Sequence, residues 1–287
     1  MAETKVLIVG CGDLGTEVAR QLTQLGIKTI GVRRSAQSIP DKETVQDLEI
    51  IPADVTQPVT LEVLGAIHPE IIVYCVAAGG QSDAEYKAAY VDGLRNVLAT
   101  QKNNTRLKHV FFVSSTRVYG QETDSLLDES VPPIPADFGG ERLLEAERLL
   151  QTLSCNGTAL RLSGIYGPGR LRMLNLAKTP GHWPQQNSWS NRIHRDDAAA
   201  FITFLIQQAL AGVAPQACYI VTDSRPVAQY EVLDWLASQL HVNQPKLIAV
   251  SGGRRLSNRF LLATGFKLQY PDYQAGYQSL LSQLTVQ

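Results

Sequence analysis

A glycine-rich turn near the start of the chain constrains its fold more than any other feature. The turn follows the apolar run KVLIV (residues 5–9) and opens the amphipathic run of residues 13–25. Gly10 permits a tight turn, Gly12 lets another molecule approach the backbone, and Gly15 lets the helix pack against the strand. This spacing predicts a strand–helix–strand unit of a parallel α/β fold.

Short apolar runs alternate with amphipathic runs through the first two-thirds of the 287 residues. Runs that are rich in Val and Ile and apolar at consecutive positions are typical of strands covered on both faces. The alternation predicts an α/β fold with a doubly wound parallel sheet. The predicted strands are residues 5–9, 28–32, 49–52, 71–76, 109–115, 158–162 and 218–221, and the predicted helices include 13–25, 83–101, 139–153, 196–210 and 227–240.

Two proline-bearing stretches break this rhythm, one at about 165–192 and the other over the last 65 or so residues. We interpret them as one smaller lobe. The predicted domains are therefore a Rossmann-type domain, residues 1–164 and 193–222, and a C-terminal substrate lobe, residues 165–192 and 223–287.

The composition limits the kind of partner. Hydrophobic residues make up 44% of the chain, charged residues 18%, and the formal net charge is −1. We therefore expect a folded protein without a positive field for nucleic acid or anionic membrane. The four cysteines are scattered, without metal-ligand spacing, and Cys75 lies in an apolar run, which favours a reducing compartment and no metal site. With no signal-peptide pattern and no membrane-length apolar run, the expected location is the cytoplasm.

The start of the first predicted helix is a candidate phosphate site. The backbone amides of Asp13 and Leu14 would point at a dinucleotide pyrophosphate from the positive end of the helix. Gly12 would let the backbone approach that pyrophosphate, while Gly10 and Gly15 would allow the tight turn and the helix–strand packing beside it. The alternative is a purely structural turn in another α/β protein.

The end of the second predicted strand indicates which dinucleotide binds. Sites that prefer NAD usually place Asp or Glu there to bind the ribose hydroxyls, whereas this chain has Arg33 and Arg34. Two guanidinium groups suit a 2′-phosphate, so we predict NADP(H) over NAD(H). The alternative is a solvated basic pair.

Further motifs follow in order: ADV (53–55), VAAGG (76–80), FVSSTRVYG (112–120), RLSGIYGPGR (161–170) and RIHRDDAAAFI (192–202). Together they resemble the extended short-chain dehydrogenase/reductase superfamily, in its NAD(P)-dependent epimerase/dehydratase group, over about residues 5–222. The spacing of the glycine motif is that of atypical members. The resemblance implies a small-molecule substrate, such as a sugar nucleotide. It leaves a homodimer as one option, because helices equivalent to 83–101 and 139–153 form a dimer bundle in many relatives.

The resemblance also implies roles for individual residues. Asp54 matches the acid that contacts adenine, with Val55 beside it, and Ala77 and Ala78 match small residues beside the nicotinamide ribose. Ser115 matches the serine that hydrogen-bonds the reacting substrate oxygen. Arg192 lies where many relatives hold a phosphate of a nucleotide sugar, and Arg170 could join it in an anion pocket; the alternative is that both are ordinary surface charges.

One departure from the family concerns catalysis. Active members carry Tyr and Lys as YxxxK at the start of the helix after the fifth strand. Here Phe138 and Arg142 take those places. Phenylalanine has no ionisable proton, and arginine stays positively charged near neutral pH. Arg142 could still hold the ribose hydroxyls, as the lysine does.

Other side chains could supply the missing proton. Tyr166 is our catalytic candidate beside Ser115, and Tyr119 and Tyr90 are further phenols; Tyr90 stands near the place of a family asparagine. His182 and His194 are the other proton carriers in motif regions. For each of these side chains the alternative is a packed, structural role.

The sequence therefore predicts an NAD(P)-dependent epimerase/dehydratase-like oxidoreductase acting on a sugar nucleotide or another small carbonyl or hydroxyl compound. The alternative is an NADP(H)-binding redox sensor or regulatory protein without hydride chemistry, because binding needs only the glycines, the helix end and the arginines.

Overall fold

A seven-stranded sheet is the centre of the computed structural model, in the order β11-β7-β5-β4-β1-β2-β3. Strands β3, β2, β1, β4 and β5 pair in parallel with unbroken register. The predicted doubly wound α/β fold is confirmed, and each predicted strand matches one strand of this sheet. The strands are β1 (Val6–Val9), β2 (Thr29–Arg33), β3 (Glu49–Pro52), β4 (Ile71–Tyr74), β5 (His109–Ser115), β7 (Asn156–Leu162) and β11 (Cys218–Val221).

The structure describes residues 6–35, 48–243 and 248–285. The chain forms two compact units: unit 1 is 1–120, 134–161 and 199–219, and unit 2 is 121–133, 162–198 and 220–287. This division differs from the predicted domains chiefly at residues 121–133. That segment contains β6 (Leu126–Leu127), which pairs with β14 (Arg255–Leu256) of unit 2.

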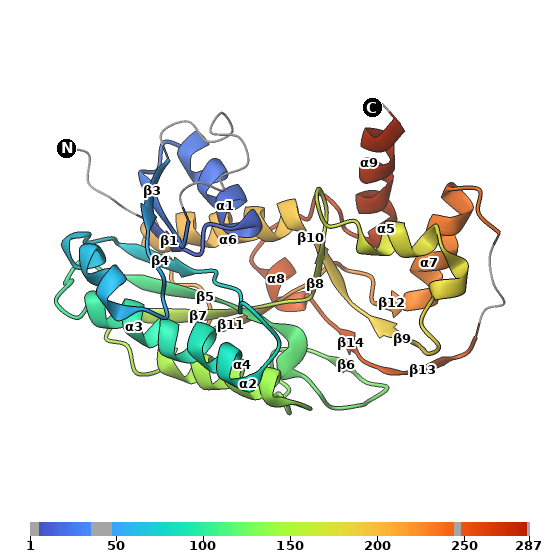
Figure 1. Ribbon diagram of the computed structural model, residues 1–287, viewed down its shortest axis with the longest axis horizontal. Helices are drawn as coiled ribbons and strands as arrows, with labels where there is room; N and C mark the ends of the chain where they lie inside the picture. The colour runs from blue at the N-terminus through green and yellow to red at the C-terminus, as the bar shows by residue number, and fades with distance from the viewer. Residues whose placement is uncertain (1–5, 36–47, 244–247, 286–287) are drawn as a thin grey trace. The chain divides into compact units, whose positions relative to one another are not determined.

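Helices cover both faces of the sheet in unit 1 (Figure 1). α1 (Asp13–Gln24) and the part of α6 (Arg195–Leu210) from Ala199 onward lie on one face. The other face carries α2 (Asp83–Tyr86), α3 (Gly93–Thr100) and α4 (Phe138–Leu150). α2 and α3 belong to one predicted helix, but a π-helical segment, η3 (Lys87–Asp92), lies between them and was not predicted. A 3-10 helix, η2 (Pro58–Ala66), was not predicted either.

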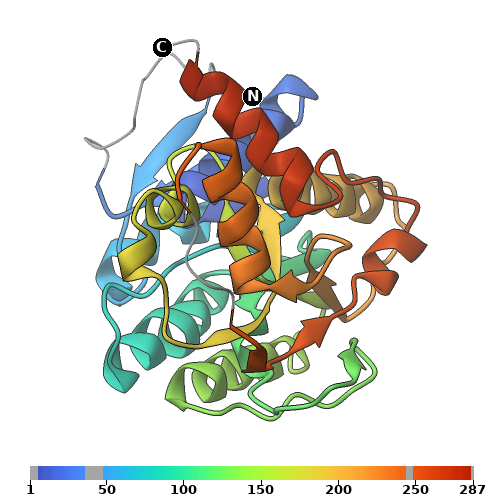
Figure 2. The same ribbon diagram turned by 90° about the vertical axis from the view of Figure 1, so that its right-hand side faces the viewer.

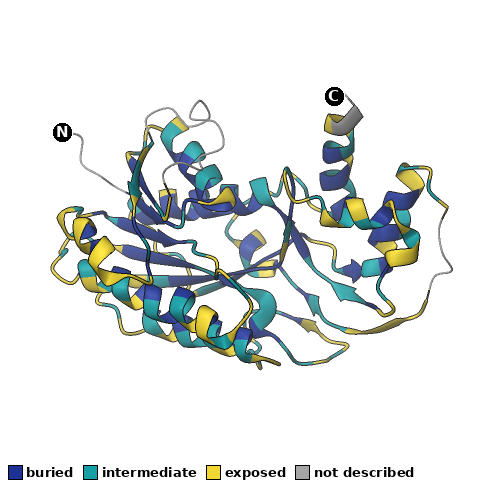
Figure 3. Ribbon diagram, viewed as in Figure 1, coloured by how far each residue is buried: buried dark blue, intermediate teal, exposed yellow. Residues whose placement is uncertain are grey.

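Consecutive apolar residues fill the sheet, as expected for strands covered on both faces. Every residue of β1 and β4 is 0% exposed, and Figure 3 shows the sheet strands largely in the colour of buried residues. Burying one large aliphatic side chain contributes about 1.5–3 kcal/mol. The sheet is therefore a rigid base for the loops that leave its strands.

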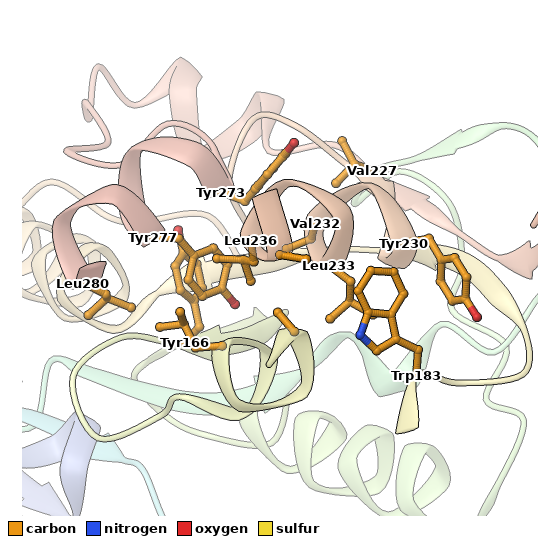
Figure 4. Packing of buried hydrophobic residues seen from close by; sticks show 13 residues of the cluster. Tyr166, Trp183, Val227, Tyr230, Val232, Leu233, Leu236, Tyr273, Tyr277 and Leu280 are labelled. Atoms are coloured by element: carbon orange, nitrogen blue, oxygen red, sulfur yellow. The ribbon is translucent and has the colours of Figure 1, made fainter. Parts of the chain in front are cut away.

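Unit 2 is built from small sheets and short helices around an aromatic core. Its sheets pair β8 (Gly164–Tyr166) with β10 (Arg192–His194), and β9 (Asn187–Ser190) with β12 (Val227–Ala228) and β13 (Val250–Gly253). Residues of α7 (Gln229–Gln239) and α9 (Tyr273–Thr285) meet in one buried cluster with Tyr166 and Trp183 (Figures 2 and 4). The remaining helices are α5 (Arg172–Ala177), η5 (Pro180–His182) and α8 (Arg259–Ala263).

No helix within the described ranges is long and apolar enough to cross a membrane.

The contact between α1 and the turn before it gives a first prediction. A Cβ atom on Gly15 would clash with the carbonyl oxygen of Gly10, whereas one on Gly12 would meet no atom of the described residues within 4 Å. We expect Gly15→Ala to lower the free energy of unfolding by about 1–3 kcal/mol, because the backbone must shift. Gly12→Ala is the matched control and should stay within about 1 kcal/mol of the wild type. Chemical denaturation measures both, and equal stability of the two variants would contradict the packing argument.

Candidate functional site

The carboxyl ends of the parallel strands bring most of the predicted site residues to one edge of the sheet in unit 1. The strand order reverses between β1 and β4, so the loops after these strands leave in opposite directions. In doubly wound folds, ligands bind in the crevice outside such a reversal. The candidate site is therefore the set of loops that follow β1, β2, β3, β4 and β5.

The turn after β1 is shaped for a close approach by another molecule. Gly10 has φ +98°, in the region that favours glycine, and a Cβ there would lie 2.5 Å from the carbonyl oxygen of Cys75. Gly12 is the N-cap of α1, and no side chain caps the helix there. Because no described residue fills the space over Gly12 and the first turn of α1 has no side-chain cap, this helix start can receive an anionic group.

The same turn is tied to the end of β2. The amides of Gly10 and Cys11 both donate to the carbonyl oxygen of Val32, at 3.0 and 2.9 Å. The Cys11 side chain fills the space over Gly31, where a Cβ would lie 2.6 Å from Sγ. Burial raises the pKa of Cys11 to about 12, so its side chain is a packed thiol. No role was predicted for Cys11. The glycine at position 31 was the sequence signal for this packing, because any larger residue there would clash with the Cys11 side chain.

Arg33 and Arg34 come directly after Val32, the residue that is hydrogen-bonded to the glycine turn. Arg33 is the last residue of β2 and is half-buried, while Arg34 is exposed. Nη1 of Arg34 lies 3.8 Å from the Cβ position of Gly79, on the loop after β4. Neither arginine has a carboxylate partner within the described part of the chain. Two positive charges that no described carboxylate pairs thus lie at the edge next to the glycine turn.

The loops after β3 and β4 carry the next predicted contacts. Oδ1 of Asp54 accepts hydrogen bonds from the amide and the hydroxyl of Thr56, at 2.9 and 2.8 Å. Val55 is buried, and its carbonyl oxygen accepts from Nδ2 of Asn96 at 2.9 Å. These bonds hold the loop that would face adenine.

Small residues and one hydroxyl continue along the edge. Ala77 is exposed, and the amide of Ala78 donates to the Tyr90 hydroxyl at 3.5 Å. Ser115 ends β5 and is half-buried, with Oγ accepting from the amide of Arg117 at 3.2 Å. The structure therefore brings the glycine turn, Asp54, Ala77, Ala78 and Ser115 to the same edge of unit 1.

The first turn of α4 differs from a Tyr–Lys pair in its contacts as well as its residues. The three side-chain nitrogens of Arg142 bind carboxylates: Nε and Nη2 donate to Asp83 at 2.7 and 2.9 Å, and Nη1 donates to Glu145 at 2.7 Å. Arg142 lies beside Asp83, whose pKa it lowers through these hydrogen bonds. Ribose binding by Arg142 stays a prediction, and it would require Arg142 to exchange these partners for ribose hydroxyls.

Arg117 is the functional-region residue that the sequence interpretation missed. Its guanidinium donates to both carboxylate oxygens of Asp137 at 2.9–3.1 Å and to the Tyr86 hydroxyl at 2.7 Å. It also lies 5.0 Å from the ring centre of Tyr86 and 5.5 Å from that of Phe138. The pair of glycines after Phe138 was the sequence signal that another group packs closely there. A Cβ on Gly139 would lie 2.5 Å from Cζ of Arg117.

Two of the alternative proton carriers are held by structural contacts. Tyr119 is fully buried, and its hydroxyl accepts from Nη1 of Arg161 at 2.6 Å. His194 is buried in unit 2, its ring lies 4.0 Å from that of Tyr270, and Nδ1 accepts from the amide of Asp196. His182 lies exposed at the end of η5. The contacts of Tyr119 and His194 fit the structural alternative.

The predicted catalytic Tyr166 lies in the core of unit 2. It is 4% exposed, and its ring stacks on that of Tyr277 at 4.4 Å (Figure 4). Its hydroxyl packs against Gly276, has no hydrogen-bond partner among the described residues, and has its pKa raised by burial. A catalytic role for Tyr166 stays a prediction, and reaching a substrate would require this core to open.

The two predicted substrate-binding arginines have different surroundings in unit 2. Arg170 is exposed on the turn after β8. Arg192 is 5% exposed, with Nη2 donating to Ser190 Oγ at 2.5 Å and the guanidinium 5.6 Å from the ring centre of Tyr273. Nη1 of Arg192 and Oδ2 of Asp223 are buried without partners among the described residues. Substrate binding by both arginines stays a prediction.

Among the described residues, no group of His, Cys, Asp or Glu side chains could hold a metal ion.

The fold and the glycine turn define a Rossmann-type dinucleotide-binding protein, and comparison with known proteins gives the family. Residues 6–220 match the model of the NAD dependent epimerase/dehydratase family, so the chain belongs to this family of enzymes. The predicted resemblance is confirmed.

Individual relatives agree with this assignment. A structure from Methylobacillus flagellatus, provisionally assigned as an NAD-dependent epimerase/dehydratase, is 49% identical, covers 99% of this chain and 100% of its own, and has a TM-score of 0.88. The spore coat polysaccharide biosynthesis protein SpsK of Bacillus subtilis is 27% identical over 184 residues, which are 61% of this chain but only 60% of SpsK. The Bordetella bronchiseptica enzyme WbmG, in complex with NAD and UDP, shares the fold at 19% identity, with 98% and 94% of the two chains covered and a TM-score of 0.78.

The buried carboxyl of Asp223 gives a prediction about pH. Burial raises its pKa to about 7, against the lowering effect of Arg192. A folded-state pKa above the unfolded value favours the folded state at low pH, and this advantage is lost as the pH rises through 7. Asp223→Asn should therefore stabilise the protein more at pH 8 than at pH 5, by roughly 1–3 kcal/mol. Denaturation at both pH values checks this, with the half-exposed Asp92→Asn as control. A gain independent of pH would refute the prediction.

Proposed function

We propose that unit 1 binds NADP(H) and that the protein is an oxidoreductase of epimerase/dehydratase type. The observation that carries the proposal is the start of α1. Among the described residues, no side chain caps its first turn and no atom lies within 4 Å of the Cβ position of Gly12, while the adjacent strand β2 ends at Arg33 with Arg34 next in the chain. A dinucleotide pyrophosphate fits this helix start, because it needs amide donors and a close approach to the backbone.

The preference for NADP(H) rests on charge. The 2′-phosphate that distinguishes NADP(H) from NAD(H) would meet Arg33 and Arg34, and β2 ends without the carboxylate that NAD-preferring sites place there. Guanidinium groups bind phosphate through paired N–H donors. Both arginines can turn to it, since no carboxylate in the described part of the chain holds them.

The remaining loops have roles along the same edge. Asp54 and Val55 would face adenine, and Ala77 and Ala78 would leave room for the nicotinamide ribose. When bound, the dinucleotide gives or takes a hydride. Ser115 Oγ would then orient the reacting oxygen of the substrate, and Phe138 would exclude water without moving a proton.

The proposed substrate is a sugar nucleotide or another small compound with a carbonyl or hydroxyl group. SpsK is named for polysaccharide biosynthesis, and the WbmG structure contains UDP together with NAD. These relatives support the class of substrate, and the pairing of a hydride carrier with a serine hydroxyl supports chemistry at a carbon–oxygen bond.

A second candidate function is NADP(H) sensing without turnover. It is favoured by the first turn of α4, where Phe138 carries no proton and Arg142 is bound by Asp83 and Glu145. A sensor would need the glycine turn and the arginines but not Ser115.

Cofactor titration tests the binding proposal. We expect NADPH to bind at least about 10-fold more tightly than NADH, because charge-assisted hydrogen bonds contribute about 1.5–3 kcal/mol each. The double variant Arg33→Gln, Arg34→Gln should lose this preference while its NADH affinity changes by less than about threefold. Arg95→Gln, an exposed arginine on α3, is the matched control. Tighter binding of NADH by the wild type would overturn the preference.

Turnover separates the two candidates. With sugar nucleotides and small carbonyl compounds as substrates, we expect dinucleotide-dependent turnover that Ser115→Ala lowers by about 10²-fold or more, a magnitude typical of lost transition-state hydrogen bonds. The NADPH affinity of Ser115→Ala should equal that of the wild type. The cofactor titration measures this and serves as the control for correct folding. Binding without turnover on any compound, together with partner capture that depends on the NADP/NADPH ratio, would instead support the sensor.

A further inference from the structure

The π-helical segment η3 presents one tyrosine to the edge of the sheet where β4 ends. α2, η3 and α3 follow one another from Asp83 to Thr100, and Ser82 and Glu85 form a capping box at the start. A π-helical turn interrupts the regular spacing of side chains, and such turns are frequent at functional sites. Here Tyr90 lies within the π-helical turn, and its hydroxyl lies 3.5 Å from the amide of Ala78.

Tyr90 also combines an accessible hydroxyl with a proton that no described residue accepts. In the described part of the chain its hydroxyl makes a single hydrogen bond, in which it accepts from Ala78. Its side chain is half-buried rather than enclosed. Among the other described tyrosines of unit 1, Tyr74 donates its proton to Ala89 O and Tyr86 donates to Oε1 of Gln81. Tyr119 and Tyr219 are 0% and 2% exposed, so a substrate cannot reach their hydroxyls as it can reach Tyr90.

Phe138 and Tyr90 both pack against the ring of Tyr86. The ring of Tyr86 lies 5.5 Å from Phe138, edge to face, and 5.2 Å from Tyr90. Tyr90 also meets Phe112 of β5 edge to face at 6.4 Å. A phenyl group at 138 therefore completes the aromatic packing that holds Tyr90 and needs no hydrogen-bond partner of its own.

The surroundings of Tyr90 keep it protonated at neutral pH. Burial raises its pKa, and the hydrogen bond from Ala78 and the charge of Arg117 oppose this only in part. Its resting form is thus a proton donor. A positive charge brought close to Tyr90 would lower its pKa.

We propose that Tyr90 is the acid that gives its hydroxyl proton to the substrate oxygen, in the place of the phenol that Phe138 lacks. This inference rests on the proposed function, in which a hydride from NADPH reaches a carbonyl carbon and reduces it to a hydroxyl-bearing carbon. The C=O π electrons move to oxygen, the Tyr90 proton binds that oxygen, and the resulting phenolate takes a proton from water. In the reverse direction the phenolate accepts the proton.

NMR titration of the full chain with tyrosine labelled at Cζ tests the inference without a known substrate. Oxidised nicotinamide is positively charged and reduced nicotinamide is neutral, so only NADP+ should lower the pKa of a nearby phenol. We expect one tyrosine resonance to titrate about 1 pH unit or more lower with NADP+ than with NADPH. That resonance should be missing in Tyr90→Phe and present in Tyr86→Phe, the matched control.

The outcomes separate the inference from the proposed function. Tyr90→Phe should keep its NADP+ affinity within about threefold of the wild type, which shows that the variant folds and binds. If the wild type binds NADP+ and the Tyr90 resonance does not shift, or if the shifted resonance survives in Tyr90→Phe, the role of Tyr90 is wrong while the binding proposal stands. Failure of the wild type to bind either dinucleotide overturns the proposed function itself.

Discussion

The close approach of α1 to the turn after β1 is the constraint on which the candidate site depends. A side chain on Gly15 would clash with the Gly10 carbonyl, and one on Gly10 would clash with the backbone after β4. Without side chains at these two positions, α1 starts directly at the sheet edge with its amides toward the open space over Gly12. The amides of Gly10 and Cys11 both donate to the carbonyl oxygen of Val32. These hydrogen bonds fix the end of β2 against the turn and so fix the position of Arg33, the last residue of β2.

The start of α4 is built on a different interaction. Arg117 is held by both oxygens of Asp137, the N-cap of α4, and its guanidinium lies against the rings of Tyr86 and Phe138. Cation–aromatic contacts contribute about 0.5–2 kcal/mol, more when they are shielded from water. Phe138 has no hydroxyl with which to make a hydrogen bond, but its ring packs against the Arg117 guanidinium, and this contact stabilises the start of α4.

Much of this fold could be predicted from the sequence because its signals are local. Apolar runs marked the seven sheet strands, and the glycine spacing marked the first turn. The contacts of Arg142 could not be predicted, because Asp83 lies 59 positions earlier in the chain. The same is true of Arg117 and Asp137, and of the burial of Arg192 and Tyr166, which depends on residues of α9. Residue type placed these side chains in motifs, but only tertiary packing decides whether a motif residue faces a ligand or a core.

Among the described residues, positive charges at one end of the sheet edge are paired and those at the other end have no carboxylate partner, which would favour one direction for a bound dinucleotide. At the α4 side, Arg117 is neutralised by Asp137, and Arg142 by Asp83 and Glu145. At the β2 side, Arg33 and Arg34 face no carboxylate in the described part of the chain. In the proposed binding mode a phosphorylated ribose would lie at the end of β2, and the pyrophosphate would lie between it and β4, over Gly12. The nicotinamide end would then lie at Ala78, Tyr90 and Ser115, close to the ring of Phe112 and on the side where Arg117 is paired with Asp137.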